Sequence, residues 1–176
     1  ATDQMQTIVT GIGSGPYGVA VDTTTHKVYV TVRDTNSVVV VDGATNRRLD
    51  AERITLPGEP YGITVKPGSQ IYVTYRNRTT DATPDRLAIY SAGAGHAGLA
   101  DVYLCAGANA EGQIVYSSSQ NRVYIPEGGP SPSTTNGDVA ILDADTYAIA
   151  ARVTVAKGPF GIIADPVRWR IYVGNR

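Results

Sequence analysis

Two polar residues, Glu111 and Gln113, stand where related segments of this sequence carry apolar side chains. Glu111 takes the aromatic position that Tyr17, Tyr61 and Phe160 hold in the other copies of one motif, and Gln113 follows at a position otherwise Val or Ile. Residues two apart on a strand point to the same face, so a carboxylate and an amide would lie together. We predict Glu111 as a catalytic acid or base and Gln113 as a ligand contact. The alternative is drift in a degenerate repeat, with Glu111 directed to water.

Two polar segments, 76–85 and 127–137, form a second group of candidates. Each contains a six-residue insertion relative to the first repeat. They could build a wall over a binding site, or they could be solvated loops of tolerated length. The spacing of their acidic residues does not match a calcium-binding loop, and we predict no metal site. The further ligand-binding candidates are Arg76, Arg78, Asp81, Glu127, Tyr17, Tyr61 and Phe160, although packing between repeats would also explain the three aromatic residues.

An internal repeat must position all of these residues. A Pro-aromatic-Gly-aliphatic motif occurs at 16–21, 60–65 and 159–164, with a degenerate copy at 110–115. The motif glycines, at 18, 62, 112 and 161, are therefore 44, 50 and 49 residues apart. A second marker, an aliphatic-Tyr-aliphatic triplet, keeps the same phase at 28–30, 71–73, 123–125 and 171–173. This period is typical of a four-stranded propeller blade.

Each repeat is predicted to form four strands, named A to D in chain order. The first marker is strand A, the second is strand B, and strand D of the first repeat is expected at 48–54. We therefore predict an all-β fold, a β-propeller with four-stranded antiparallel blades, of which about three and a half are present in one partial domain. The expected boundaries are 14–54 for blade 1, 58–104 for blade 2, 108–155 for blade 3, 157–176 for half of blade 4, and 7–12 for a possible ring-closing strand.

The sequence resembles the YVTN family of β-propeller repeats, most closely at 39–46 and at Tyr-Val-Gly-Asn in 172–175. The resemblance implies a ring that usually has seven blades and is often closed by an N-terminal strand. The chain would then be the N-terminal half of a longer propeller, and its open edges would be covered by the missing half or by a second copy. Family members include streptogramin lyase relatives, surface and periplasmic proteins, and dehydrogenase subunits, so the resemblance does not select one activity.

The two histidines do not support the hypothesis that the protein is a lyase. Streptogramin lyases use histidines, a glutamate and magnesium in later blades, and these positions cannot be carried over to this chain. His26 and His96 fall in A-to-B and C-to-D turns, which places them on the face opposite the usual site. No particular cofactor is indicated.

Composition limits the partners of the protein. The formal net charge is −1, so the sequence offers no basic stripe and nucleic-acid binding is unlikely in this interpretation. No apolar run approaches the roughly 20 residues of a membrane span. The single cysteine, Cys105, cannot form an internal disulfide and is expected to be an inert buried thiol. The small first residue, Ala1, favours a secreted, periplasmic or cell-surface protein.

These observations favour a binding or scaffold module. It would recognise a small molecule, a glycan or a protein on the face formed by the D-to-A and B-to-C loops. The alternative is a lyase or hydrolase whose active site lies at the mouth of the central channel, with Glu111 as a contributor.

Overall fold

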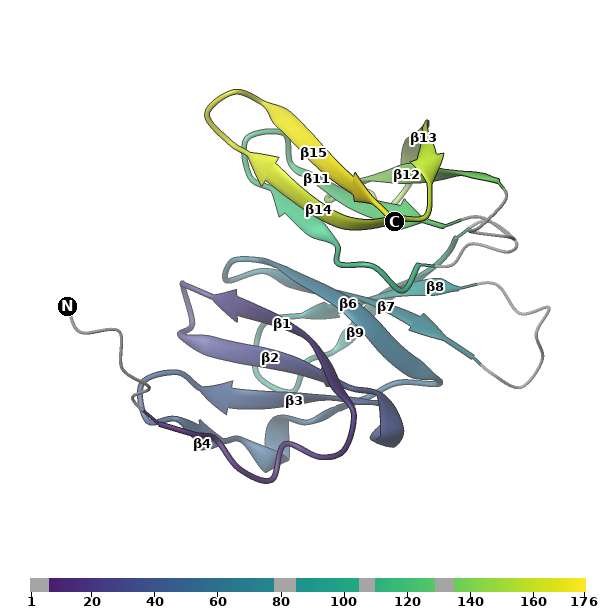
Figure 1. Ribbon diagram of the computed structural model, residues 1–176. Helices are drawn as coiled ribbons and strands as arrows, with labels where there is room; N and C mark the ends of the chain where they lie inside the picture. Colours follow the sequence, from purple (N-terminus) through teal and green to yellow (C-terminus); the bar gives the residue numbers. More distant parts are fainter. Residues whose placement is uncertain (1–6, 78–84, 105–109, 129–134) are drawn as a thin grey trace.

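The computed structural model describes residues 7–77, 85–104, 110–128 and 135–176 (Figure 1). In these ranges the regular structure is antiparallel β-sheet, interrupted by the short 3-10 turns Arg33–Thr35 and Asp50–Glu52. No helix of the described ranges is long and apolar enough to cross a membrane.

The strands form four sheets that follow one another along the chain. Blade 1 contains β1 (Pro16–Asp22), β2 (Lys27–Val32), β3 (Ser37–Asp42), β4 (Arg47–Arg48) and β5 (Ile54–Thr55). Blade 2 contains β6 (Glu59–Lys66), β7 (Gln70–Arg76), β8 (Arg86–Ser91) and β9 (Gly98–Tyr103). Blade 3 contains β10 (Val115–Ser117), β11 (Arg122–Glu127), β12 (Asn136–Asp143) and β13 (Ile149–Lys157). The half-blade contains β14 (Pro159–Asp165) and β15 (Arg170–Asn175).

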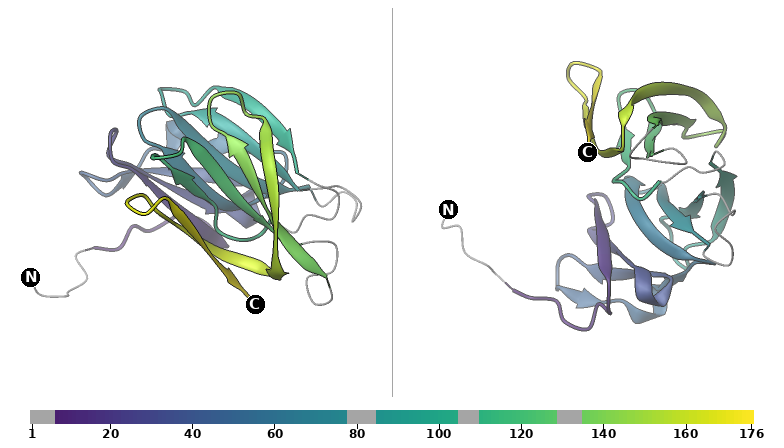
Figure 2. Two further views of the ribbon diagram at one scale, coloured as in Figure 1. Left: turned by 90° about the horizontal axis from the view of Figure 1, so that it is seen from above. Right: turned by 45° about the vertical axis from the view of Figure 1, so that its right-hand side comes forward.

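Successive blades stack side by side in an arc (Figure 2, right). The order of strands in blades 2 and 3 is the simple meander β6-β7-β8-β9 and β10-β11-β12-β13. This arrangement confirms the predicted all-β propeller architecture, with about three and a half blades in this chain.

Aspartates at the ends of strands shape the turns. The carboxylate of Asp22 accepts hydrogen bonds from the backbone N–H groups of Thr24 and Thr25 at 2.8 and 3.2 Å. Four positions after Asp22, His26 has a φ of 57°, in the left-handed region. The same pattern recurs after Asp42, Asp143 and Asp165. The side chain replaces a backbone acceptor in each turn and so fixes the register of the hairpin.

The hydrophobic core lies between blades. Alternating side chains of blade 1, such as Tyr29 and Val40, pack on Ile63 of blade 2 in one cluster. Tyr72 of blade 2 packs on Leu142 of blade 3 in a second. Each sheet is therefore stabilised chiefly by its neighbours, as in other repeat architectures. The outward faces of the two end blades stay exposed, with the following side chains uncovered by more than half: Val19, Val21 and Ile163.

Strand D of blade 1 differs from the prediction. Instead of one strand over 48–54, the chain forms the two-residue strands β4 and β5 on either side of the Asp50–Glu52 turn. Glu52 in this turn forms an ion pair with Lys27 at 2.6 Å and contacts His96 Nε2 at 3.1 Å. The turn thus replaces continuous strand pairing with polar contacts to β2 and to blade 2.

Residues 7–12 are also not in a strand. Val9 and Ile12 pack against Val32, Val39 and Val41 on the outward face of blade 1. Pairing of this segment with a further blade remains a prediction.

Candidate functional site

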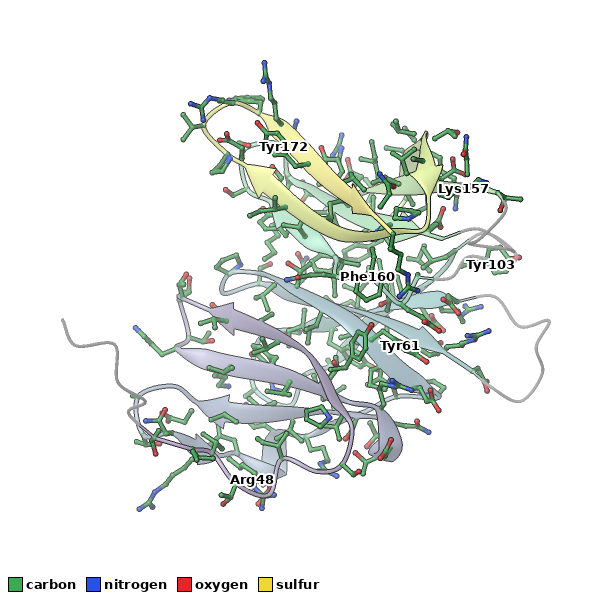
Figure 3. All side chains as sticks on the ribbon, in the orientation of Figure 1. Arg48, Tyr61, Tyr103, Lys157, Phe160 and Tyr172 are labelled. Atoms are coloured by element: carbon green, nitrogen blue, oxygen red, sulfur yellow. The ribbon has the colours of Figure 1, made fainter. Side chains whose placement is uncertain are left out.

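The first strand of each blade faces the inside of the arc, and a cavity of about 340 Å³ opens there. Its walls come from β1, β6, β14 and the stretch before β10. Figure 3 labels Phe160 on β14 and Tyr61 on β6. The lining residues are Tyr17, Gly18, Val19, Gly62, Ile63, Gln113 and Phe160.

The motif glycines bring the blades into close backbone contact at this wall. A Cβ atom on Gly18 would lie 2.6 Å from the carbonyl oxygen of Tyr61 in blade 2. Gly62 and Gly112 meet carbonyl oxygens of the next blade in the same way, and even more closely. The Thr31 hydroxyl joins the first pair, because it accepts from Gly18 N at 2.7 Å and donates to Tyr61 O at 2.9 Å. Only glycine allows this approach.

Residues 110–113, which we call the inner segment, connect several blades. The Tyr17 hydroxyl donates to the Glu111 carbonyl oxygen at 2.9 Å, which joins blade 1 to the inner segment. Gln113 N donates to Phe160 O at 3.0 Å, and Ala110 N donates to Asp85 Oδ2 at 2.6 Å. The segment therefore makes polar contacts with blades 1, 2 and 4.

The inner segment does not form the strand that the sequence predicted. Strand β10 begins only at Val115, because Gln113 N bonds to β14 and Gly112 approaches the Phe160 carbonyl oxygen. The prediction that Glu111 and Gln113 share one face of a strand is therefore wrong. The Glu111 carboxylate lies 3.0 Å from Arg76 Nη1, whereas Gln113 is exposed and lines the cavity.

Arginines occupy equivalent positions in three blades. Arg33 follows β2, Arg76 is the last residue of β7, and Arg176 follows β15. The Arg33 guanidinium lies 5.1 Å from the centre of the Tyr61 ring and 5.7 Å from that of Tyr17. Arg176 lies 4.4 Å from the centre of the Phe160 ring. Arg76 meets Glu111 instead of an aromatic ring, so an ion pair replaces a cation–π contact in this blade.

Asp85 is a buried carboxyl group of this region, with 2% of the residue exposed. Burial raises its pKa to about 6, and the nearby charges of Glu111 and Glu127 act in the same direction. The hydrogen bond from Ala110 N and the positive charge of Arg76 oppose the shift. The sequence did not single out Asp85, because nothing in its local pattern reveals how deeply it is buried.

The structure brings together some of the predicted site residues and separates others. Tyr17, Phe160 and Gln113 line the cavity, and Arg76 and Glu111 form an ion pair beside them. Tyr61 is 2% exposed, with its ring edge-on to Tyr17 at 5.4 Å, so it supports the site without facing it. Glu127, predicted as a ligand contact, is 1% exposed, and Arg152 Nε donates to its carboxylate at 3.0 Å.

Three of the named residues, Arg78, Asp81 and Cys105, lie outside the described residues. Neither His26 nor His96 lines the cavity. His96 is buried, with its ring nitrogens 3.0 Å from Ser91 O and 3.1 Å from Glu52 Oε2. In the described part of the chain, no three His, Cys, Asp or Glu side chains are grouped so that they could hold a metal ion.

The fold and this inner wall define a β-propeller module. No protein-family model matches the sequence, and no curated protein matches it. The resemblance to YVTN repeats therefore stays a prediction.

Solved structures support the fold. The Dos1 propeller is 13% identical with a TM-score of 0.68, over 91% of this chain and 42% of that one. Hydrazine synthase of Kuenenia stuttgartiensis is 16% identical with a TM-score of 0.67, over 85% of this chain and 39% of that one. The nidogen/laminin complex gives 18% identity and a TM-score of 0.64, over 91% of this chain and 55% of that one. The chain thus spans about half, or less, of the proteins it resembles.

Proposed function

We propose that this propeller module binds a small ligand in the inner cavity, with Phe160, Tyr17 and Gln113 as its contacts. The observation that carries the proposal is the cavity itself, since it combines two aromatic side chains with an exposed amide. A volume of about 340 Å³ suits a small molecule or one or two sugar rings. Aromatic rings provide flat apolar contacts, and the Gln113 amide can both donate and accept hydrogen bonds. This combination fits the ring of a neutral sugar.

Support for an enzyme at this position is weaker. The Glu111 carboxylate already accepts a hydrogen bond from Arg76 at 3.0 Å, so it is engaged as a structural partner between blades. The pKa of Asp85 is raised to about 6, but this residue is buried and does not line the cavity. Ligand binding needs neither group to react.

We also propose that further blades of the same repeat cover the free face of the half-blade. In blade 1, Gly18 and Asp22 contact Tyr61 O and Gly68 N of the next blade. At the equivalent residue Gly161, no atom lies within 4 Å of the place that a Cβ atom would take, and Ile163 is 64% exposed. The half-blade therefore presents the surface that elsewhere receives a neighbouring blade. Seven blades, and a secreted, periplasmic or surface location, remain predictions.

Binding can be tested by titrating the isotope-labelled chain with a panel of neutral sugars, including glucose, galactose and N-acetylglucosamine, and recording amide chemical shifts. We expect saturable shifts at Gly18, Gly62 and Gln113, and their loss in Phe160→Ala and Gln113→Ala. Tyr103→Ala is the matched control, because this aromatic residue is half exposed on β9 and does not line the cavity. Shifts confined to residues outside the cavity would contradict the proposal.

A further inference from the structure

We infer that Asp85 is a positioning residue that latches the inner segment onto blade 2 in its ionised form and releases it when protonated, so that pH regulates the inner cavity. The latch stands on contacts within the protein. Only its consequence for ligand binding rests on the function proposed above.

Asp85 holds the chain on both sides of the connection between blades 2 and 3. Its carboxylate oxygen Oδ2 accepts from Ala110 N at 2.6 Å, and its backbone carbonyl accepts from Leu104 N at 3.2 Å. Leu104 follows β9, and Ala110 begins the inner segment. Because Asp85 immediately precedes β8, these two bonds attach Leu104 and Ala110 to the start of that strand.

The charges around Asp85 come from three directions. Arg76 at the end of β7 places its Nε 4.0 Å from Asp85 Oδ1, and the same guanidinium is ion-paired with Glu111 of the inner segment. Glu127 at the end of β11 acts as a further negative charge, although Arg152 from β13 accompanies it. Asp85 and Glu111 thus share one arginine, with a third carboxylate nearby. Two acidic groups that share one cation favour protonation of the more buried one.

Protonation of Asp85 weakens the latch for two reasons. A neutral carboxyl group is a poorer acceptor than a carboxylate, so the bond from Ala110 N loses its charge-assisted part. Arg76 also loses one of its two anionic partners and is left with Glu111 alone. Because the pKa of Asp85 lies at about 6, both forms of the carboxyl group are accessible near neutral pH.

The inner segment transmits this change to the cavity. Beyond Ala110, the Glu111 carbonyl oxygen accepts a hydrogen bond from the Tyr17 hydroxyl, and the backbone N–H of Gln113 donates to Phe160 O. Tyr17, Phe160 and Gln113 all line the cavity. A looser attachment at Ala110 therefore alters three of its lining residues together.

The latch and the global stability respond to pH in opposite directions. The folded pKa of Asp85, about 6, lies above its ordinary value of 3.8, so the folded protein binds the proton more tightly than the unfolded chain. The contribution of Asp85 to stability consequently grows as pH falls from about 6 towards 4. A local loosening at Ala110 that accompanies a global stabilisation distinguishes the latch from ordinary acid unfolding.

The experiment measures the latch without any ligand. The carboxyl carbon shift of Asp85 and the exchange protection of the Ala110 amide are recorded by NMR between pH 7.5 and 4.5. We expect a transition near pH 6 and a decrease in protection of about tenfold. In Asp85→Asn, protection at Ala110 is expected to be low at every pH. Asp34→Asn, which changes an exposed carboxylate of blade 1, should behave as the unmodified protein.

Each result decides one claim. If the Asp85 carboxyl carbon does not titrate between pH 5 and 7, or if protection at Ala110 stays constant while it titrates, the latch is refuted. The carboxyl titration uses the unmodified chain, so it decides the matter even if Asp85→Asn folds poorly. Repeating the sugar titration at pH 7 and pH 5 separates the two proposals. A latch without sugar binding refutes only the proposed ligand, and sugar binding without a titrating Asp85 refutes only the latch.

Discussion

Arg76 Nη1 lies 3.0 Å from Glu111 Oε1, and this pair takes the place that Arg33 and Tyr61 occupy between blades 1 and 2. Both arginines come four residues after the marker tyrosine of their blade and reach the motif residue of the next blade. The carboxylate that interrupts the aromatic series is therefore matched to an arginine of the preceding blade. These contacts indicate that Glu111 joins the inner segment to blade 2.

The first prediction compares these two contacts by double-mutant cycles. Replacing Arg76 and Glu111 with Ala, singly and together, should give a coupling energy of about 0.5–1 kcal/mol, because the pair is partly exposed. The Arg33 and Tyr61 cycle should give a similar value from the cation–π contact. Chemical denaturation at low and high salt provides the measurement. Only the Arg76 cycle should weaken with salt; equal salt dependence would argue against an ion pair.

The second prediction concerns the motif glycines. Gly62→Ala should lower the free energy of unfolding by about 1–3 kcal/mol, because the new methyl group collides with the Gly112 carbonyl oxygen and the blades must separate. Gly161→Ala is the matched control, since no atom lies within 4 Å of the added carbon. Thermal unfolding of the 176-residue chain should show this difference.

Gly62→Ala and Gly161→Ala also test whether a further blade packs on the half-blade. In a longer protein that carries further blades, Gly161→Ala should become as destabilising as Gly62→Ala. If it remains neutral there, the half-blade does not receive a neighbour in the way that blade 1 does.

The third prediction concerns acid stability. Burial tends to raise the pKa of Asp22, but the backbone N–H groups of Gly68, Thr24 and Thr25 outweigh it and hold this pKa below its usual value of 3.8. A lowered folded pKa means that the carboxylate stabilises the protein above pH 4 and that this stabilisation is lost as pH falls below that value. Asp22→Asn should therefore destabilise the protein by about 1–3 kcal/mol at pH 7 and by less near pH 3.

Asp42→Asn is the control for Asp22. Asp42 makes the same two turn contacts, to Ala44 N and Thr45 N, but within the described ranges it has no bond to another blade corresponding to Gly68 N. Urea denaturation at both pH values should show the larger loss for Asp22→Asn. Equal losses would mean that the turn, and not the contact between blades, determines the effect.

The fourth prediction concerns alkaline pH. Burial raises the pKa values of Tyr29 and Tyr75 to about 12, and the neighbouring Asp101 carboxylate adds to the shift at Tyr75. Their neutral forms therefore stabilise the folded protein below pH 10, and this stabilisation is lost as pH rises from about 10 to 12. Asp101→Asn should bring the pKa of Tyr75 closer to 10. Ultraviolet titration of the phenolate absorbance tests this, and an unchanged titration curve would contradict it.

The repeat made much of the fold predictable. Strands A, B and C of blades 1 and 2 follow the marker motifs, since alternation and turn residues are local properties that each blade repeats. Prediction failed where contacts between blades override that local pattern. Glu52 leaves strand D to meet His96 of blade 2, as well as Lys27 of its own blade, and Gln113 leaves strand A to bond Phe160 of the half-blade.

The candidate site was predictable in part for the same reason. Comparison of repeats identified Glu111 and Gln113 as departures, and Gln113 does line the cavity. The pairing of Glu111 with Arg76 and the burial of Tyr61 depend on how the blades pack. Asp85 was not singled out, because a charged residue in a polar segment gives no sign that it is buried.

The sequence by itself determined the blade period, the marker strands and the aspartate turns, because each of these depends on residues close together in the chain. Only the tertiary structure decided which side chains meet at the inner wall. Tyr17 reaches Glu111 O across 94 residues of sequence, and Arg76 reaches Glu111 across 35. Such contacts depend on the curvature of the arc and on the depth at which each group is buried. Those properties arise only when several blades pack together and exclude water from the space between them.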